Sequence, residues 1–161
     1  MNSPKYSRLK IDWVLIHELA IGKAPISEAH TNQLSKCNIK AILSLCSAEE
    51  ACYPESLEEH FNCKRVVLPD HHSGRLPTLR ELNQALDILA GLLNESGAVF
   101  VHCVAAMERS PLVCMGWLVK KYKMSPQRAL DYMMEIHRGT NPLPGQLALL
   151  RDLEVEFKAN Q

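Results

Sequence analysis

The residues best suited to chemistry lie in one short segment, residues 99–111, which reads VFVHCVAAMERSP. An apolar run ends at Cys103, five residues follow, and Arg109 then precedes a Ser-Pro pair that suits the first turn of a helix. A tight loop that enters a helix can turn several backbone N–H groups inward, and the helix N-terminus adds partial positive charge. Arg109 adds a planar guanidinium that can hold two oxygens of one phosphate. The spacing therefore predicts an oxyanion site with a thiol beside it.

The side chains of this segment have distinct predicted roles. The field that binds an oxyanion also stabilises a thiolate, so Cys103 is a predicted nucleophile aimed at phosphorus. Ser110 is expected to hydrogen-bond that sulfur and help it leave, and His102 is expected to order the loop carbonyls. The predicted substrate-binding residues fill the rest of the loop: Val104, Ala105, Ala106, Met107, Glu108 and Arg109.

The string H-C-x5-R-S at a strand–loop–helix junction resembles the signature of the cysteine-based protein tyrosine phosphatases, in particular their compact dual-specificity branch. Further similar segments are Ile21-Gly22 followed by Pro25, and residues 40–43, 66–70 and 146–157. The resemblance spans roughly residues 11–157. It implies hydrolysis of phosphotyrosine, with phosphoserine or phosphothreonine also possible, through a cysteinyl-phosphate. It also implies a phosphoprotein or phosphopeptide partner and no metal or organic cofactor.

The resemblance also implies a general acid, an Asp on a loop after an earlier strand, which protonates the leaving group and then activates water. Asp70 occupies that place, after the run VVLP and about thirty residues before Cys103. Its neighbours His71 and His72 are expected to be solvated loop residues, because no third ligand at suitable spacing indicates a metal site.

Two residues depart from the family pattern. Ala106 stands where the family usually has Gly, and a positive φ there would cost about 1 kcal/mol or more. Glu108 directly precedes Arg109, where its charge would either repel a phosphate dianion or turn outward to a basic side chain near Lys120 or Arg80. If Ala106 strains the loop, a slow phosphatase is expected.

Three other functions fit parts of the same pattern. A phosphate-binding pseudophosphatase, which grips a phosphoprotein without turnover, is favoured by the two departures. A phosphatase acting on a non-protein ester, such as an inositol lipid or an RNA 5′ end, would favour basic residues at the variable loop positions, which are absent here. Sulfur transfer, as in rhodanese-like domains, also uses a Cys loop, but the flanks His102 and Ser110 fit phosphatases better.

The rest of the chain supplies the elements that position these residues. The expected strands are one or two within residues 11–21, then 40–45, 63–68 and 98–101. Six helices are expected. The first follows Ser27, the second covers residues 49–60, and the third begins at the Thr78/Glu81 capping box. The other three run from Ser110 to about 121, from Ser125 to about 138, and from 144 to 157. We therefore expect one α/β domain over residues 1–161, with a mostly parallel central sheet of about four or five strands flanked by helices.

Composition narrows the class of protein further. The chain has 161 residues with 18 Lys+Arg and 18 Asp+Glu, and this zero balance argues against a nucleic-acid binder. The polar N-terminus shows no secretory signal, and no apolar run is long enough to cross a membrane. The six cysteines form no C-x-x-C pair, which argues against a zinc site. Because no secretory signal is seen, reduced thiols and a cytoplasmic protein are expected.

Overall fold

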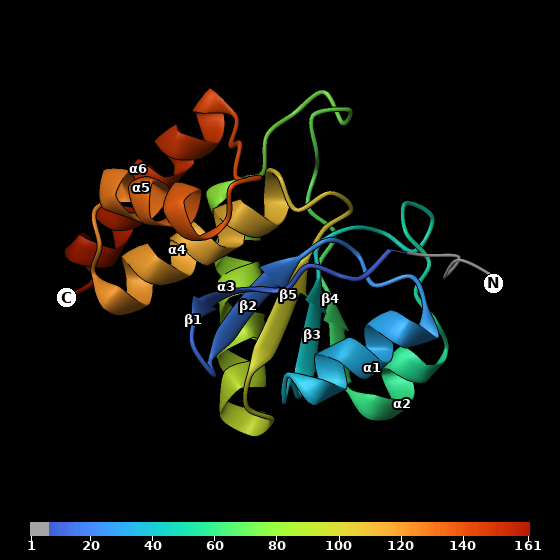
Figure 1. The fold of residues 1–161 in the computed structure, drawn as a ribbon. Coiled ribbons are helices and arrows are strands. Elements are labelled where there is room, and N and C mark those ends of the chain that lie inside the picture. Colours follow the sequence, from blue (N-terminus) through green and yellow to red (C-terminus); the bar gives the residue numbers. More distant parts are fainter. Residues whose placement is uncertain (1–6) are drawn as a thin grey trace.

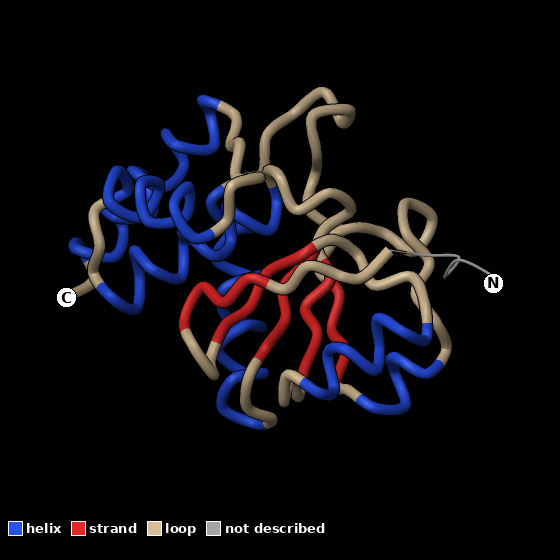
Figure 2. The backbone as a smooth tube through the Cα atoms, in the orientation of Figure 1, coloured by secondary structure: helices blue, strands red, loops and turns tan. Residues whose placement is uncertain are grey.

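A five-stranded sheet in the order β1-β2-β5-β3-β4 crosses the middle of the molecule (Figures 1 and 2). The structure is a computed structural model that describes residues 7–161; residues 1–6, part of the N-terminus in which no secretory signal is recognised, lie outside that range. The strands are β1 (Asp12–Leu15), β2 (Leu19–Gly22), β3 (Ala41–Ser44), β4 (Asn62–Arg65) and β5 (Val99–His102).

The strand that delivers the predicted nucleophile lies at the centre of the sheet. β5 pairs in parallel with β2 on one side and with β3 on the other, and β3 pairs in parallel with β4. Among the strands of residues 7–161, β1 alone runs antiparallel, as the first strand of a hairpin with β2. The prediction of a mostly parallel sheet is confirmed, and residues 11–21 form two strands. All residues of β5 are buried, as a central parallel strand requires.

Helices cover both faces of the sheet. Figure 1 shows α1 and α2 together on one side, with α3 behind the sheet and α4 to α6 grouped on the other. The helices are α1 (Glu28–Lys36), α2 (Ser56–His60), α3 (Leu79–Glu95), α4 (Arg109–Tyr122), α5 (Pro126–Ile136) and α6 (Pro144–Ala159). This arrangement is the α/β architecture that the alternating sequence pattern predicts. None of these helices is both long and apolar enough to cross a bilayer.

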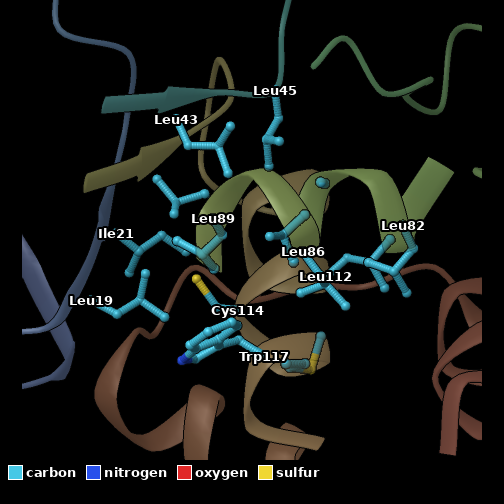
Figure 3. Close-up of a cluster of buried hydrophobic side chains, with 14 of the residues drawn as sticks. Leu19, Ile21, Leu43, Leu45, Leu82, Leu86, Leu89, Leu112, Cys114 and Trp117 are labelled. Carbon is cyan, nitrogen blue, oxygen red and sulfur yellow. The ribbon is translucent and has the colours of Figure 1, made fainter. Parts of the chain in front are cut away.

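Two hydrophobic clusters, one on each face of the sheet, anchor the site. The larger cluster joins β2, β3 and β5 to α3 and α4, and Figure 3 shows Leu43, Leu89 and Cys114 among its members. The smaller one packs Phe100 and Ile42 of the sheet against the α1 side. Cys114 is fully buried in the larger cluster, which confirms the prediction that it is a core residue.

Local signals at the helix starts are present as predicted. Thr78 accepts a hydrogen bond from the Glu81 N–H, and the Glu81 carboxylate accepts one from the Thr78 N–H, so the capping box that opens α3 is complete. Ser125 caps α5 through the Arg128 N–H. α3 turns its leucines to the sheet, which explains its strong periodicity.

The structure corrects three predicted boundaries. The helix expected over residues 49–60 is restricted to α2, because Pro54 interrupts the segment and residues 51–54 are irregular. The strand expected over residues 63–68 is the shorter β4, although the Val66 N–H still donates to the Ser44 carbonyl. α5 ends at Ile136 rather than at about residue 138, and His137 follows in an extended conformation that leads its side chain away from the helix.

Candidate active site

The predicted nucleophile lies where β5 ends and the loop to α4 begins. Cys103 is 2% exposed, and its Sγ lies 3.2 Å from the Ser110 Oγ in the first turn of α4. The carboxyl ends of the three central parallel strands meet at this edge, which is where α/β sheets bind ligands. The structure therefore brings the thiol, the hydroxyl and the start of a helix together at one point.

Hydrogen bonds hold carbonyl groups of the loop so that they point away from its centre. Those of Cys103, Val104, Ala106 and Met107 each accept a hydrogen bond. The donors, in that order, are His102 Nδ1, the Ala24 N–H, His137 Nε2 and the Asn141 N–H, at 2.9, 3.2, 2.7 and 2.7 Å. Because a trans peptide points its N–H opposite to its carbonyl, the N–H that follows each of these carbonyls faces the inside of the loop. The loop is therefore a concave set of donors of the kind that binds anions.

Ala106 adopts the left-handed conformation, with a φ of 58°. A non-glycine residue there costs about 1–2 kcal/mol, so the strain foreseen at this departure from the family pattern is present. Its carbonyl nevertheless points outward to His137, and its methyl group is buried in the main core rather than in the pocket. Any contact of Ala106 with substrate is therefore expected through its backbone.

Arg109 is held rigidly beneath the loop. Its Nη1 donates to the carbonyls of Leu45 and Leu68, and Nη1 and Nη2 bind the two carboxylate oxygens of Glu50 at 3.2 and 2.9 Å. Among residues 7–161 its buried Nε has no hydrogen-bond partner. A buried donor of this kind requires a partner, and an oxyanion in the loop supplies one.

Glu50 is a residue of the site that the sequence did not reveal, because residues 49–60 were expected only to form a helix. The hydrogen bonds from the Arg109 guanidinium, which outweigh the opposing effect of burial, hold the pKa of Glu50 below its usual range, and the Ser47 N–H adds to this lowering. The charge of Arg109 is disfavoured by its burial, but Glu50, Cys103 and Asp70 outweigh that cost and raise its pKa. No spacing rule links residues 50 and 109, so the pair was not visible in the sequence.

Asp70 lies on the loop between β4 and α3 and faces the same site. One carboxylate oxygen lies 3.9 Å from Arg109 Nη2, and the other accepts hydrogen bonds from Ser73 Oγ and the His72 N–H at 3.0 Å each. Burial opposes ionisation, but these bonds and the Arg109 charge outweigh it and lower the pKa of Asp70. The predicted acid is thus a carboxylate in the free enzyme.

Glu108 joins the phosphate loop to the Asp70 loop. Its Oε1 accepts a hydrogen bond from the His71 N–H at 2.9 Å and lies 3.1 Å from His71 Nδ1. The sequence analysis left open whether this carboxylate repels substrate or pairs with a basic group near Lys120 or Arg80. The structure gives a different partner, which lies in the loop that carries the predicted acid.

His102 is a fully buried neutral support for the loop. Its Nε2 lies 2.7 Å from Ser44 Oγ of β3, and its Nδ1 donates to the Cys103 carbonyl. Burial, which the hydrogen bond to Cys103 only partly offsets, lowers the pKa of His102 to about 4. Its ring therefore orders a loop carbonyl, as the sequence analysis expected.

These groups surround a pocket of about 620 Å³. Cys103, Arg109 and Asp70 line it, as do four of the predicted substrate-binding residues, Val104, Ala105, Met107 and Glu108. Val104 and Met107 are 40% and 45% exposed and give the rim an apolar character. A larger groove of about 920 Å³ runs along α1, but none of the predicted site residues lines it.

One cluster at the pocket edge has metal-ligand chemistry. Ligand atoms of Asp70, His71 and His72 lie within 4.8 Å of one another, so the third group that the sequence analysis lacked is the aspartate itself. Asp70 already accepts two hydrogen bonds, and His71 Nδ1 faces Glu108. The chemistry that we derive below uses none of these atoms as a metal ligand.

Comparison with known sequences assigns a family to the part of the chain that contains this site. The family model described as the dual specificity phosphatase catalytic domain matches residues 21–156. Dual specificity protein phosphatase 1-A of Xenopus laevis is 26% identical over 109 residues, which cover 68% of this chain and 29% of that protein. Dual specificity protein phosphatase 5 of Homo sapiens is 27% identical over 125 residues, which cover 77% and 31%. The chain spans less than a third of the length of these relatives.

Solved structures share the fold. PTPMT1 in complex with PI(5)P aligns with a TM-score of 0.79 at 21% identity, over 89% of this chain and 94% of that one. The human tyrosine phosphatase-like serine/threonine/tyrosine-interacting protein aligns with a TM-score of 0.77 at 20% identity, over 92% and 97%. At these identities the alignments establish a common architecture.

Proposed function

The chain belongs to the dual specificity phosphatase family through its catalytic domain, and from this premise we propose that it hydrolyses phosphoproteins through a cysteinyl-phosphate. Phosphotyrosine is the proposed substrate, with phosphoserine and phosphothreonine as further ones. The observation that carries the proposal is the buried Nε of Arg109, which has no partner among residues 7–161, in a pocket lined by both Cys103 and Asp70. A phosphate bound there satisfies that donor and lies between a nucleophile and an acid.

The first step transfers the phosphoryl group to sulfur. The inward N–H groups of the loop and Arg109 hold the non-bridging oxygens, and the Cys103 thiolate attacks phosphorus. The P–S bond forms as the P–O bond to the substrate breaks, and the electron pair of that bond leaves with the tyrosine oxygen. Asp70, in its protonated form, gives its proton to this oxygen, so a neutral phenol departs.

The second step returns the enzyme to its starting state. Asp70, now a carboxylate, takes a proton from water while the water oxygen attacks phosphorus. The P–S bond breaks, and its electron pair returns to Cys103 as a thiolate. The Ser110 hydroxyl, 3.2 Å from that sulfur, donates a hydrogen bond to the developing charge. Inorganic phosphate is the second product.

The protonation of Asp70 needs the substrate. In the free enzyme, its hydrogen bonds and Arg109 favour the carboxylate. A phosphate dianion bound to Arg109 offsets that positive charge and adds a negative one nearby, and both changes raise the pKa of Asp70. The acid form is thus favoured when a leaving group is in place to receive the proton.

The character of the pocket supports a phosphoprotein over a polyanionic ester. Within the described chain, Arg109 is the only permanently cationic side chain that lines the pocket. Val104 and Met107 present apolar surface at the rim, which suits an aromatic ring. Inositol lipids and RNA 5′ ends carry several charges and favour more cations. A nucleophilic thiol also requires a reducing compartment, so we propose a cytoplasmic setting.

A phosphate-binding module without turnover is the second candidate function. The left-handed Ala106 and the bidentate grip of Glu50 on Arg109 favour it, because both restrict the adjustments that a reacting loop makes. A neighbour in fold is described as an interacting protein. The two candidates predict the same binding but opposite results for turnover.

The test is turnover of para-nitrophenyl phosphate and of a phosphotyrosine peptide in the presence of EDTA. We expect hydrolysis by the parent protein and none by Cys103→Ser, which should still bind the peptide because the anion donors remain. Cys37→Ser is the matched control, since it makes the same change outside the pocket. Peptide binding without turnover by the parent protein would establish the module instead. Faster turnover of an inositol phosphate than of the peptide would reassign the substrate class.

A further inference from the structure

The imidazole of His137 connects the phosphate loop to β1. His137 directly follows the last residue of α5 in an extended conformation, and it is 8% exposed. Nε2 lies 2.7 Å from the Ala106 carbonyl, and Nδ1 lies 2.6 Å from Asp12 Oδ2. Both contacts are short, and both reach residues far away in the sequence. Neither His137 nor Asp12 belongs to the phosphatase motif.

The two partners of the ring fix its orientation. A carbonyl oxygen can only accept, so Nε2 donates to Ala106. On the opposite edge of the ring, Nδ1 lies 2.6 Å from Asp12 Oδ2. Contacts at both nitrogens therefore hold the ring against the Ala106 carbonyl.

The carbonyl that His137 holds belongs to the strained residue of the loop. Ala106 sits at a φ of 58°, a conformation that its side chain disfavours. The peptide that joins Ala106 to Met107 is planar, so its carbonyl orientation determines where the Met107 N–H points. With the carbonyl on His137, that N–H faces away from the ring. Met107 lines the pocket and His137 does not, so the N–H faces the phosphate side.

We propose that His137, paired with Asp12, is a positioning residue that holds the Ala106 peptide outward so that the Met107 N–H can bind the phosphate. The proposal rests on the proposed function for its effect on turnover, whereas its effect on anion binding stands alone. The next carbonyl, that of Met107, is held by the Asn141 N–H, so residues 137–141 support two successive loop peptides. Without the donor at residue 137, the Ala106 carbonyl loses the hydrogen bond that holds it outward, and its peptide can rotate. One phosphate donor would then be lost.

The test compares three variants by inhibition with inorganic orthovanadate and by steady-state kinetics. His137→Leu removes the ring nitrogen that holds the Ala106 carbonyl, so the Met107 N–H should no longer face the anion. The loss of one such anion donor is expected to lower kcat/KM by about 10²-fold and to weaken vanadate inhibition at least tenfold. His137→Gln keeps an N–H near the position of Nε2 and is expected to stay within about threefold of the parent in both measurements.

His30→Leu is the matched control. His30 is also buried, at 5% exposure, and each of its ring nitrogens makes a backbone hydrogen bond, to Ser7 and Ile26, which do not line the pocket. It should lower thermal stability and leave vanadate inhibition and kcat/KM within about threefold. Equal losses in His137→Leu and His30→Leu would overturn the proposal, because a merely structural role moves both alike.

Direct observation of the ring keeps the proposal testable if His137→Leu fails to fold. In the ¹⁵N-labelled parent protein, the His137 ring should show an N–H proton on Nε2 that is hydrogen-bonded to the Ala106 carbonyl. A ring without a proton on Nε2 in the parent would overturn the assignment. A parent that binds phosphate, measured by calorimetry, but does not hydrolyse a phosphotyrosine peptide would reject the proposed function. In that case dependence of phosphate binding on His137 would still support its positioning role.

Discussion

Glu108 offers the sharpest test of how the phosphate loop and the acid loop work together. Its carboxylate accepts the His71 N–H, next to the predicted acid Asp70. We therefore expect Glu108→Ala to lower kcat on substrates whose leaving group needs protonation, because Asp70 is no longer held over the pocket. A competing explanation assigns Glu108 the opposite effect, in which its negative charge repels the phosphate dianion and slows the enzyme.

The size of the effect follows from the contact. A hydrogen bond in an exposed setting contributes about 0.5–1.5 kcal/mol, which corresponds to about 2-fold to about 13-fold in rate. Glu108→Gln keeps an oxygen that can accept the His71 N–H but removes the charge. Positioning therefore predicts that Glu108→Gln is nearly as fast as the parent and that Glu108→Ala is slower. Charge repulsion predicts that both variants are faster.

The assay is kcat/KM on a phosphotyrosine peptide and on an activated aryl phosphate. The loss in Glu108→Ala should be confined to the peptide, because the leaving group of the activated ester departs without a proton. A gain in both variants on both substrates would refute the positioning argument and show that Glu108 handicaps the loop through its charge.

The remaining predictions concern four residues. Asp70→Asn should lower kcat on phosphotyrosine peptides by about 10²–10⁴-fold and remove the basic limb of the pH–rate profile, and a silent substitution would place the acid elsewhere. Ser73→Ala removes a hydrogen bond that stabilises the Asp70 carboxylate, so the pKa of Asp70 rises and the basic limb should move to higher pH; a shift downward contradicts the geometry. Ala106→Gly relieves the left-handed strain but deletes a buried methyl group, and each effect is about 1 kcal/mol. Chemical denaturation should therefore give a free energy of unfolding close to that of the parent, and kcat/KM should stay within about threefold. Thr78→Ala breaks the capping box of α3 and should lower the free energy of unfolding by about 0.5–2 kcal/mol at unchanged kcat, as measured by urea unfolding.

Most of the fold could be predicted from the sequence, because the signals that mark its helices and strands are local. The capping box at Thr78, the Ser-Pro starts of two helices and the apolar strand of residues 98–101 lie within a few residues of the elements that they define. The boundaries failed where local signals were weak, as in the acidic segment 49–60. The end of α5 was placed about two residues too late, because the nearest glycine, Gly139, lies three residues beyond Ile136.

Within the site, the groups that could be predicted from the sequence share one segment: the thiol, the arginine and the serine of residues 103–110. Their spacing places them at one loop because five residues suffice to turn from a strand into a helix. The tertiary structure alone decided what holds them in place. Glu50 reaches Arg109 across 59 residues, Glu108 reaches His71 across 37, and Asp12 reaches His137 across 125. No periodicity or motif encodes such contacts, because they arise only when packing of the sheet and helices brings distant side chains together.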